Sequence, residues 1–167
     1  AGADGRSTVI VTDSSTGNTA AMVSHLRRSI PGATLVDLTA IRMGKCLGCL
    51  KCGFDNVCVY EGTKDQFVDV FRTRVLTADT IIFAGTVHDR YLSSLWQRYL
   101  ERTFVFTHQP RLDGKQIAFL VSGPLAQNHN AREILHSYVE VMRGHLVGIV
   151  TDECRDSAVL DREIETL

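Results

Sequence analysis

The chain has 167 residues, of which 44% are hydrophobic and 22% charged, and its formal net charge is −1. These values are typical of one soluble globular domain with its own core, which we expect over residues 7–167 after a disordered tail at 1–6. The near-neutral charge excludes a strongly basic surface for nucleic acid or membrane, and no apolar run reaches the roughly 20 residues of a membrane-spanning helix. Four of the five cysteines are clustered, which favours a cytoplasmic protein with chemically active thiols over a disulfide framework.

The sequence alternates between short apolar runs, which predict buried strands, and longer segments with apolar residues three and four positions apart, which predict helices. The predicted strands are 7–13, 33–38, 80–85, 116–122 and 146–151, and a cysteine-rich loop at 39–62 follows the second strand. The first helix is expected at 19–30, and the second opens on the capping-box sequence 63–66 and has Phe67, Val68, Phe71 and Val75 on one face. The apolar faces of the other three helices consist of Leu92, Leu95, Trp96 and Tyr99, then Ile134, Leu135, Tyr138 and Met142, and finally Leu160, Ile164 and Leu167.

This alternation of strands and helices predicts an α/β fold with a parallel sheet covered by helices on both faces. Right-handed crossovers place the loops that follow the strands along one edge of such a sheet, and ligands bind at that edge. We therefore expect the loops 13–19, 86–91 and 122–128 to converge there. The cysteine-rich loop follows the second strand, so we expect it at the same edge.

The first of these loops, Thr12–Thr19, has the composition of a phosphate-binding turn. It contains hydroxyl side chains, a glycine and the start of a helix, whose free N–H groups attract anions. It has neither the G-K-[ST] ending of nucleotide triphosphatases nor the G-x-G-x-x-G of dinucleotide-binding domains. A plain polar turn that caps a helix is the alternative. We expect Asp13, at the end of the strand, to act in capping and not in proton transfer, because no partner carboxylate is placed near it.

The sequence Ser14-x-Thr16-Gly17-Asn18-Thr19 resembles the [ST]-x-T-G-N-T phosphate loop of flavodoxins, in the same place after the first strand. The resemblance extends over the order of strands and helices, and it implies a flavodoxin-like doubly wound sheet of five parallel strands in the order 2-1-3-4-5. It also implies an FMN cofactor. The residues that would hold its phosphate are Ser14, Ser15, Thr16, Gly17, Asn18 and Thr19.

Residues 80–103 resemble the flavin-flanking segment of NAD(P)H-dependent FMN reductases and iron-sulfur flavoproteins. The positions that align with their pattern are Gly85, Thr86, Tyr91, Leu95, Leu100 and Arg102, whereas Val87-His88-Asp89 stands where the families have Pro-Val-Tyr. The resemblance implies a flavin-facing loop made of Thr86, Val87, His88, Asp89 and Tyr91, and a second one made of Ser122, Gly123 and Pro124. His88 is a candidate to exchange a proton with the flavin, and a surface histidine without a role is the alternative.

Cys46, Cys49, Cys52 and Cys58 have the spacing C-x2-C-x2-C-x5-C, which lets four thiolates converge on one inorganic core from a tight turn. Structural zinc sites commonly pair two separated C-x2-C units, so the third cysteine favours a [4Fe-4S] cluster. The motif also resembles the compact cysteine motif of iron-sulfur flavoproteins. Zinc, a reversible disulfide and thiols without a metal remain alternatives. We expect Cys154 to be a packed bystander and Trp96 to belong to the core.

The favoured interpretation is an iron-sulfur flavoprotein that passes electrons between a [4Fe-4S] cluster and FMN. A cluster-free NAD(P)H-dependent FMN or quinone reductase and a flavodoxin-type electron carrier are the alternatives, although simple flavodoxins are usually more acidic than this chain. The family resemblance implies NAD(P)H or a ferredoxin-like carrier as redox partner. It also implies a homodimer or homotetramer.

Overall fold

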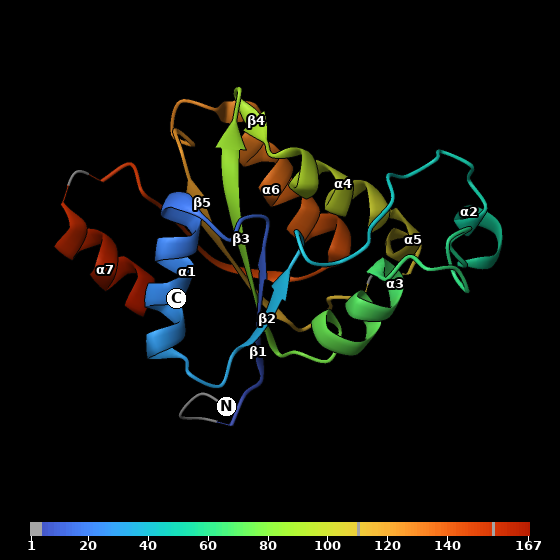
Figure 1. Ribbon diagram of the computed structural model, residues 1–167, viewed down its shortest axis with the longest axis horizontal. Helices are drawn as coiled ribbons and strands as arrows, with labels where there is room; N and C mark the ends of the chain where they lie inside the picture. Colours follow the sequence, from blue (N-terminus) through green and yellow to red (C-terminus); the bar gives the residue numbers. More distant parts are fainter. Residues whose placement is uncertain (1–4, 110, 155) are drawn as a thin grey trace.

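The computed structural model describes residues 5–109, 111–154 and 156–167, so most of the predicted disordered tail lies outside the described residues (Figure 1). Its centre is a parallel sheet in the order β2-β1-β3-β5-β6, which confirms the predicted order 2-1-3-4-5. The five strands are β1 (Thr8–Thr12), β2 (Thr34–Asp37), β3 (Thr80–His88), β5 (Gln116–Ser122) and β6 (His145–Thr151). All five lie close to the predicted positions, because long apolar, β-branched runs have few alternatives to a buried strand.

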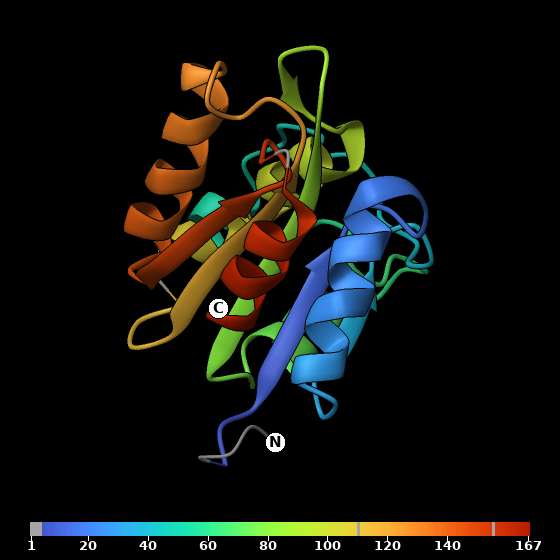
Figure 2. The same cartoon turned by 90° about the vertical axis from the view of Figure 1, so that its left-hand side faces the viewer.

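Helices cover both faces of the sheet, as Figures 1 and 2 show. On one face lie α1 (Gly17–Ser29) and α7 (Ser157–Glu165), side by side at the front of Figure 2. The other face carries α3 (Phe67–Val70), its π-helical continuation η1 (Phe71–Val75), α4 (Ser94–Arg102), α5 (Phe104–Thr107) and α6 (His129–Met142). In the described part of the chain, none of these helices is both long and apolar enough to cross a bilayer.

Each strand divides its side chains between two separate cores, because successive residues point to opposite faces. In β3, Ile82 packs under α1 and α7, whereas Ile81 and Phe83 pack under α4 and α6. Trp96 is 1% exposed in the second core, and its indole N–H donates to the carbonyl of Ala84 at 3.2 Å. The prediction that Trp96 is a core residue is therefore confirmed.

The structure departs from the predicted elements at the start of one helix and agrees with them at the start of another. Leu92 belongs to the short strand β4 (Tyr91–Leu92) instead of the following helix, which begins only after Ser93, whose hydroxyl accepts from the N–H of Trp96. The helix predicted after the sequence 63–66 is present as α3 and η1, and its predicted face is buried: Phe67, Val68, Phe71 and Val75. It begins at Phe67, whose N–H donates to the carboxylate of Asp65 at 3.1 Å.

Candidate functional site

The loop between β1 and α1 lies at the carboxyl edge of the sheet, where the strand order reverses. Strand β1 lies between β2 and β3, so the chain first adds a strand on one side of β1 and then continues the sheet on the other side. The N-cap of α1 is Thr16, whose side chain makes no capping hydrogen bond, and the first turn of α1 carries no acidic residue. Among the described residues, the first N–H groups of α1 therefore have no capping side chain, which leaves them available to an anion.

The turn that leads into α1 is held by its own side chains. Ser14 donates its hydroxyl to the carbonyl of Thr16 at 2.9 Å and accepts from the N–H of Thr16 at 3.2 Å. Gly17 has φ +68°, a left-handed conformation, with open space where a Cβ would lie. Thr19 is buried, and its hydroxyl lies 2.9 Å from that of Thr86 on β3. These contacts fix the loop and leave Ser15, Thr16, Gly17 and Asn18 exposed to solvent.

Asp13, which we expected to cap the helix, is instead a buried link between β1 and the end of β3. Its carboxylate accepts from the N–H of Thr86 at 3.0 Å and from the hydroxyl of Ser93. Burial raises the pKa of Asp13, and the hydrogen bonds from Ser93 and Thr86 act in the opposite direction. Asp13 thus ties the edge of the sheet to the start of α4.

Asp152, just after β6, is an edge residue that the sequence did not reveal. It accepts from the Ser122 hydroxyl at 2.7 Å, the Gly123 N–H at 2.8 Å and the Asn18 amide at 3.0 Å. Burial opposes ionisation, but these three donors hold the pKa of Asp152 below its usual range. Three groups expected to face the flavin are therefore joined by one carboxylate, which brings the first loop and the loop after β5 together.

The predicted flavin loop at 86–91 is a β-hairpin. β3 continues to His88, and β4 returns antiparallel to it, with Val87 opposite Leu92. The turn is formed by Asp89 and Arg90, with φ of +48° and +66°. Val87 is buried, whereas the His88 side chain is 73% exposed and lies 2.9 Å from the carboxylate of Asp89. His88 thus stands on an exposed projection of the edge, and Tyr91 is exposed beside it.

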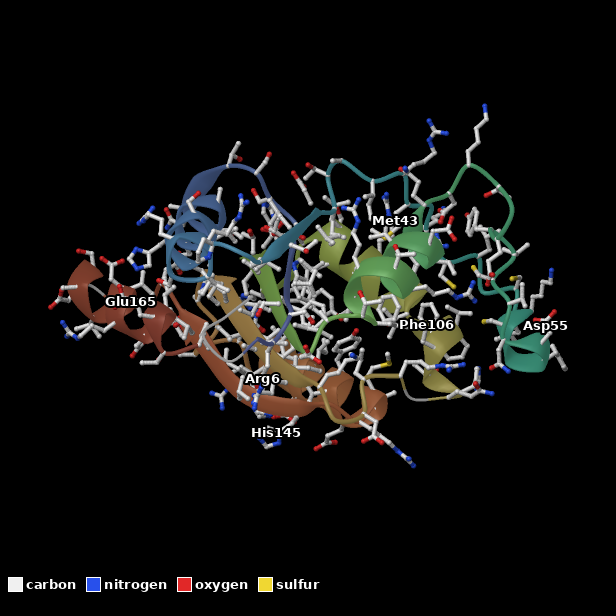
Figure 3. The ribbon with its side chains drawn as sticks, turned by 90° about the horizontal axis from the view of Figure 1, so that it is seen from below. Arg6, Met43, Asp55, Phe106, His145 and Glu165 are labelled. Carbon is white, nitrogen blue, oxygen red and sulfur yellow. The ribbon has the colours of Figure 1, made fainter. Side chains whose placement is uncertain are left out.

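The cysteine segment, residues 44–65, lies away from the phosphate loop. It includes the short helix α2 (Cys52–Asp55), which Figures 1 and 3 place beyond α5, on the far side of the molecule from α1 and α7. In Figure 3, Asp55 and Glu165 mark opposite ends of the molecule. Our expectation that the cysteines lie at the carboxyl edge is wrong, because the segment leaves that edge after β2 and packs along the outer side of α4 and α5.

Arg102, the last residue of α4, anchors both ends of the cysteine segment. Its guanidinium pairs with Asp65 through contacts of 2.8 and 2.9 Å, and their side chains are 1% and 6% exposed. The same guanidinium donates to the carbonyl of Gly44 at 2.9 Å and towards the sulfur of Cys58 at 3.6 Å. It also lies 4.4 Å from the centre of the Tyr60 ring. The buried guanidinium of Arg102 therefore holds together the two ends of the segment 44–65.

All four clustered cysteines are free thiols and line a single small cavity of about 40 Å³, together with Arg102. Burial raises the pKa of Cys52, and the charges of Cys58, Cys46 and Cys49 act in the same direction, as expected for neighbouring thiols. Within the ranges that the structure describes, no three His, Cys, Asp or Glu side chains are grouped closely enough to hold a metal ion. Cys154 is exposed, so its prediction as a packed residue is wrong.

No protein-family model matches the sequence, and no curated protein matches it. Its structure, however, superimposes on solved structures over almost its whole length. A WrbA-like flavodoxin from Agrobacterium tumefaciens is similar with a TM-score of 0.66 and 14% identity, over 96% of this chain and 90% of that one. A flavodoxin from Megasphaera elsdenii is similar with a TM-score of 0.58 and 17% identity, over 95% of each chain. The chain has the flavodoxin-like fold.

A third structure with this flavodoxin-like fold is an FMN-dependent NADH-azoreductase from Bacillus anthracis, solved in complex with FMN. It is similar with a TM-score of 0.67 and 10% identity, over 96% of this chain and 94% of that chain. At such identities the likeness establishes the fold, and the chemistry has to be argued from this chain's own residues.

Three residues that shape the two sites escaped the sequence analysis in this role. Asp152 follows the last strand without any motif, and Asp65 and Arg102 are far apart in sequence. A signal existed for one of them: Arg102 follows Tyr99 by three residues, which places it on the apolar face of its helix, and a charged residue on a buried face requires a partner. Its partner could not be identified from the sequence, because Asp65 becomes its neighbour only after the chain has folded.

Proposed function

We propose that this protein binds FMN at the carboxyl edge of its sheet and acts as a redox flavoprotein. The observation that carries the proposal is the uncapped N-terminus of α1 at the point where the strand order reverses. A neutral loop with free N–H groups holds a phosphate through backbone donors and the helix dipole. The phosphate would contact Ser14, Ser15, Thr16, Gly17, Asn18 and Thr19.

The ring system would lie between the hairpin and the loop after β5, which both rise from this edge. Its neighbours would be Thr86, Val87, His88, Asp89, Tyr91, Ser122, Gly123 and Pro124. His88 is the exposed imidazole of the hairpin and the candidate for proton exchange with bound flavin. FMN supplies the electron transfer, while these residues bind and orient it. We propose the cytoplasm as the site of action and NAD(P)H or a ferredoxin-like carrier as redox partner of a homodimer or homotetramer.

The test adds a negative charge where the phosphate would bind without weakening the helix. Aspartate is a favourable N-cap, so Thr16→Asp is expected to leave the melting temperature unchanged or slightly raised. It is also expected to weaken FMN binding by about tenfold or more through like-charge repulsion, measured by quenching of flavin fluorescence. The binding of riboflavin, which lacks the phosphate, should be the same in Thr16→Asp as in the wild type. Ser157→Asp adds the same charge at the start of α7 and serves as the control; equal losses in both variants, or no FMN binding by the wild type, refute the proposal.

We further propose that Cys46, Cys49, Cys52 and Cys58 ligate a [4Fe-4S] cluster that exchanges electrons with the flavin. What supports this proposal is the chemistry of the donors, since all four thiols are free and line one cavity. The described thiols are not grouped closely enough to hold a metal ion and the cavity is small, so the segment would have to rearrange around a cluster. Protein purified without air should contain about four iron and four sulfide per chain, with Cys52→Ser reducing both and Cys154→Ser neither. Iron-free yellow protein would favour the cluster-free FMN or quinone reductase.

A further inference from the structure

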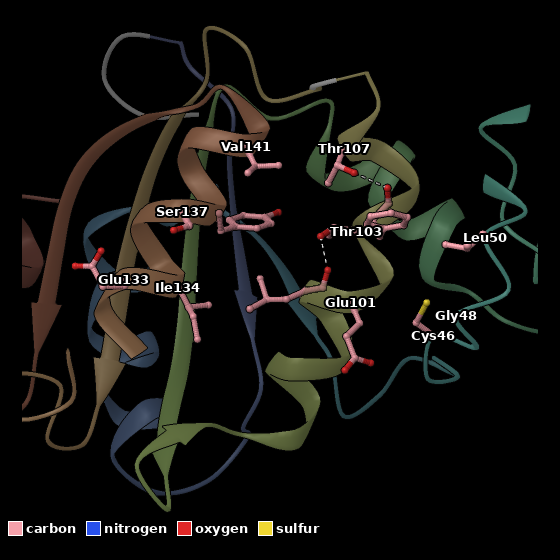
Figure 4. A pocket seen from close by; sticks show the side chains of 13 residues that line it. Cys46, Gly48, Leu50, Glu101, Thr103, Thr107, Glu133, Ile134, Ser137 and Val141 are labelled. Carbon is pink, nitrogen blue, oxygen red and sulfur yellow. Dashed lines mark hydrogen bonds between the residues drawn. The ribbon is translucent and has the colours of Figure 1, made fainter. Parts of the chain in front are cut away.

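An apolar groove lies between α6 and the α4–α5 pair, adjoining the cysteine segment beside α5. Figure 4 shows Ile134, Ser137 and Val141 on α6, on one side of the groove, and Thr103 and Thr107 on the other side. The groove encloses about 690 Å³, within the range of roughly 300–1,000 Å³ of small-molecule sites. It is formed by the flanks of these helices and not by the carboxyl edge, so it is separate from the site proposed for FMN.

The groove gathers large apolar side chains that folding leaves exposed. Leu50, Phe104 and Val141 line it, although they are 61%, 40% and 51% exposed. Leu47 and Val59, exposed at 56% and 40%, line the adjoining cavity of the cysteines. Exposed apolar side chains are ordinary when scattered, but a contiguous patch around a hollow is a mark of a binding surface. The patch is therefore best explained by an occupant with an apolar body.

The polar residues of the groove select the charge of that occupant. Glu101 and Glu133 are its charged lining residues, and no Lys, Arg or His stands among the described residues that line it. The hydroxyls of Thr103 and Thr107 already donate to backbone carbonyls, at 2.7 and 2.8 Å, so towards a ligand they offer acceptor lone pairs. Carboxylates and acceptors disfavour a phosphate or carboxylate ligand, which excludes FMN and NAD(P)H from this groove.

We infer that the groove binds an aromatic organic molecule that is uncharged or cationic, lying against Phe104 and in contact with the cysteine segment. The contact follows from shared walls: Cys46, Leu50 and Glu101 line both the groove and the cavity of the cysteines. Aromatic rings bury much apolar area and stack favourably on an exposed phenylalanine. The inference holds whether or not the chain binds FMN, since no residue of the groove belongs to the proposed flavin site.

Three fluorescent dyes of different charge test this selection on the full chain: Nile red, which is neutral, thioflavin T, which is cationic, and anilinonaphthalenesulfonate, which is anionic. We expect saturable binding of the first two at one site and about tenfold weaker binding of the third. In the combined variant Glu101→Gln, Glu133→Gln, the affinity for the anionic dye should come closer to the affinities for the other two dyes. Ser137→Trp fills the groove and should abolish binding, whereas Arg132→Trp, on the opposite side of α6, should bind as the wild type does. Equal binding by both tryptophan variants, or a preference for the anionic dye, overturns the inference.

The cysteines provide a second, independent readout. In iron-free protein, whose thiols are free to react, saturating Nile red should slow the alkylation of Cys46 by iodoacetamide several-fold, measured for each cysteine by mass spectrometry. Cys154, which is exposed after β6, is the internal control and should react at an unchanged rate. Unchanged reactivity of Cys46 at saturation would overturn the predicted contact. Concentration-dependent dimers that are lost in Ser137→Trp would show a second copy of the chain in the groove and would also overturn the inference.

Discussion

Replacing Arg102 by methionine is expected to release the cysteine segment and to cost far more stability than the loss of one surface charge. Methionine retains much of the apolar length of the side chain but removes the guanidinium that pairs with Asp65 and reaches Gly44 and Cys58. The carboxylate of Asp65 would then remain in a site where its side chain is 6% exposed, without a compensating charge. Removing one partner of a buried pair costs about 3–5 kcal/mol.

That loss is large against the free energy of unfolding of a single domain, which is typically about 5–15 kcal/mol. It is measured by urea unfolding followed by circular dichroism, with the slope of the transition checked for a change in the denatured state. The exposed pair between Arg72 and Glu61 is the matched control: its contact is 2.7 Å, but its side chains are 44% and 21% exposed. Arg72→Met is therefore expected to cost about 1 kcal/mol or less.

A double-mutant cycle with Asp65→Asn separates the ion pair from the other contacts of Arg102. Neutralising both partners removes the unpaired charge, so the coupling energy between the two positions should be about 2–3 kcal/mol. Limited proteolysis should cut first within residues 44–65 in Arg102→Met. A loss below about 1 kcal/mol, or additive single effects, would refute the view that this pair anchors the segment.

Three further predictions concern acid stability, packing and the flavin site. Burial opposes ionisation of Asp65, but the hydrogen bonds from Arg102 and two backbone N–H groups lower its pKa. The contribution of Asp65 to stability is thus complete above the unfolded pKa of about 3.9 and is lost as the pH falls through the lower folded pKa. Urea unfolding at a series of acidic pH values should show that the free energy of unfolding changes less with pH in Arg102→Met than in the wild type. Gly85→Ala should cost about 1–3 kcal/mol, because its Cβ would overlap the indole of Trp96, and a changed fluorescence of that single tryptophan reports the shift. Asp152→Asn removes a negative charge beside Asn18 and should strengthen FMN binding by about two- to tenfold in a fluorescence titration; weaker binding would contradict this.

The parallel sheet and its working edge were accessible from the sequence because they follow from local patterns. Strand β3 is a run of apolar residues between polar turns, and such a run has one stable environment, the middle of a sheet covered on both faces. Once the strands are parallel, the loops after them must meet at one edge. Thr19 and Thr86, from two of these loops, lie in contact as this reasoning requires. The hairpin at 86–91 was missed because its turn is made by Asp89 and Arg90, neither of which is the glycine that commonly marks a left-handed turn.

The position of the cysteine segment could not be predicted, because it depends on contacts between residues distant in sequence. The spacing of the thiols limits how they lie relative to one another but not where the segment packs. That is decided by Arg102, which binds Gly44 before the cysteines and Asp65 after them. A buried ion pair of this kind has no local sequence signal, since each partner alone is indistinguishable from a surface charge.

Helix α4 connects the two sites that this fold separates. Ser93, at its N-terminus, donates to Asp13 at the edge proposed for FMN, and Arg102, at its C-terminus, holds the cysteine segment. The nine residues of α4 span roughly 14 Å at about 1.5 Å per residue. Any exchange of electrons between a flavin at the edge and a cluster at the cysteines of the same chain would therefore run alongside this helix. Loss of Arg102 should then remove the cysteine site while leaving FMN binding intact, which makes the two sites separable by a single substitution.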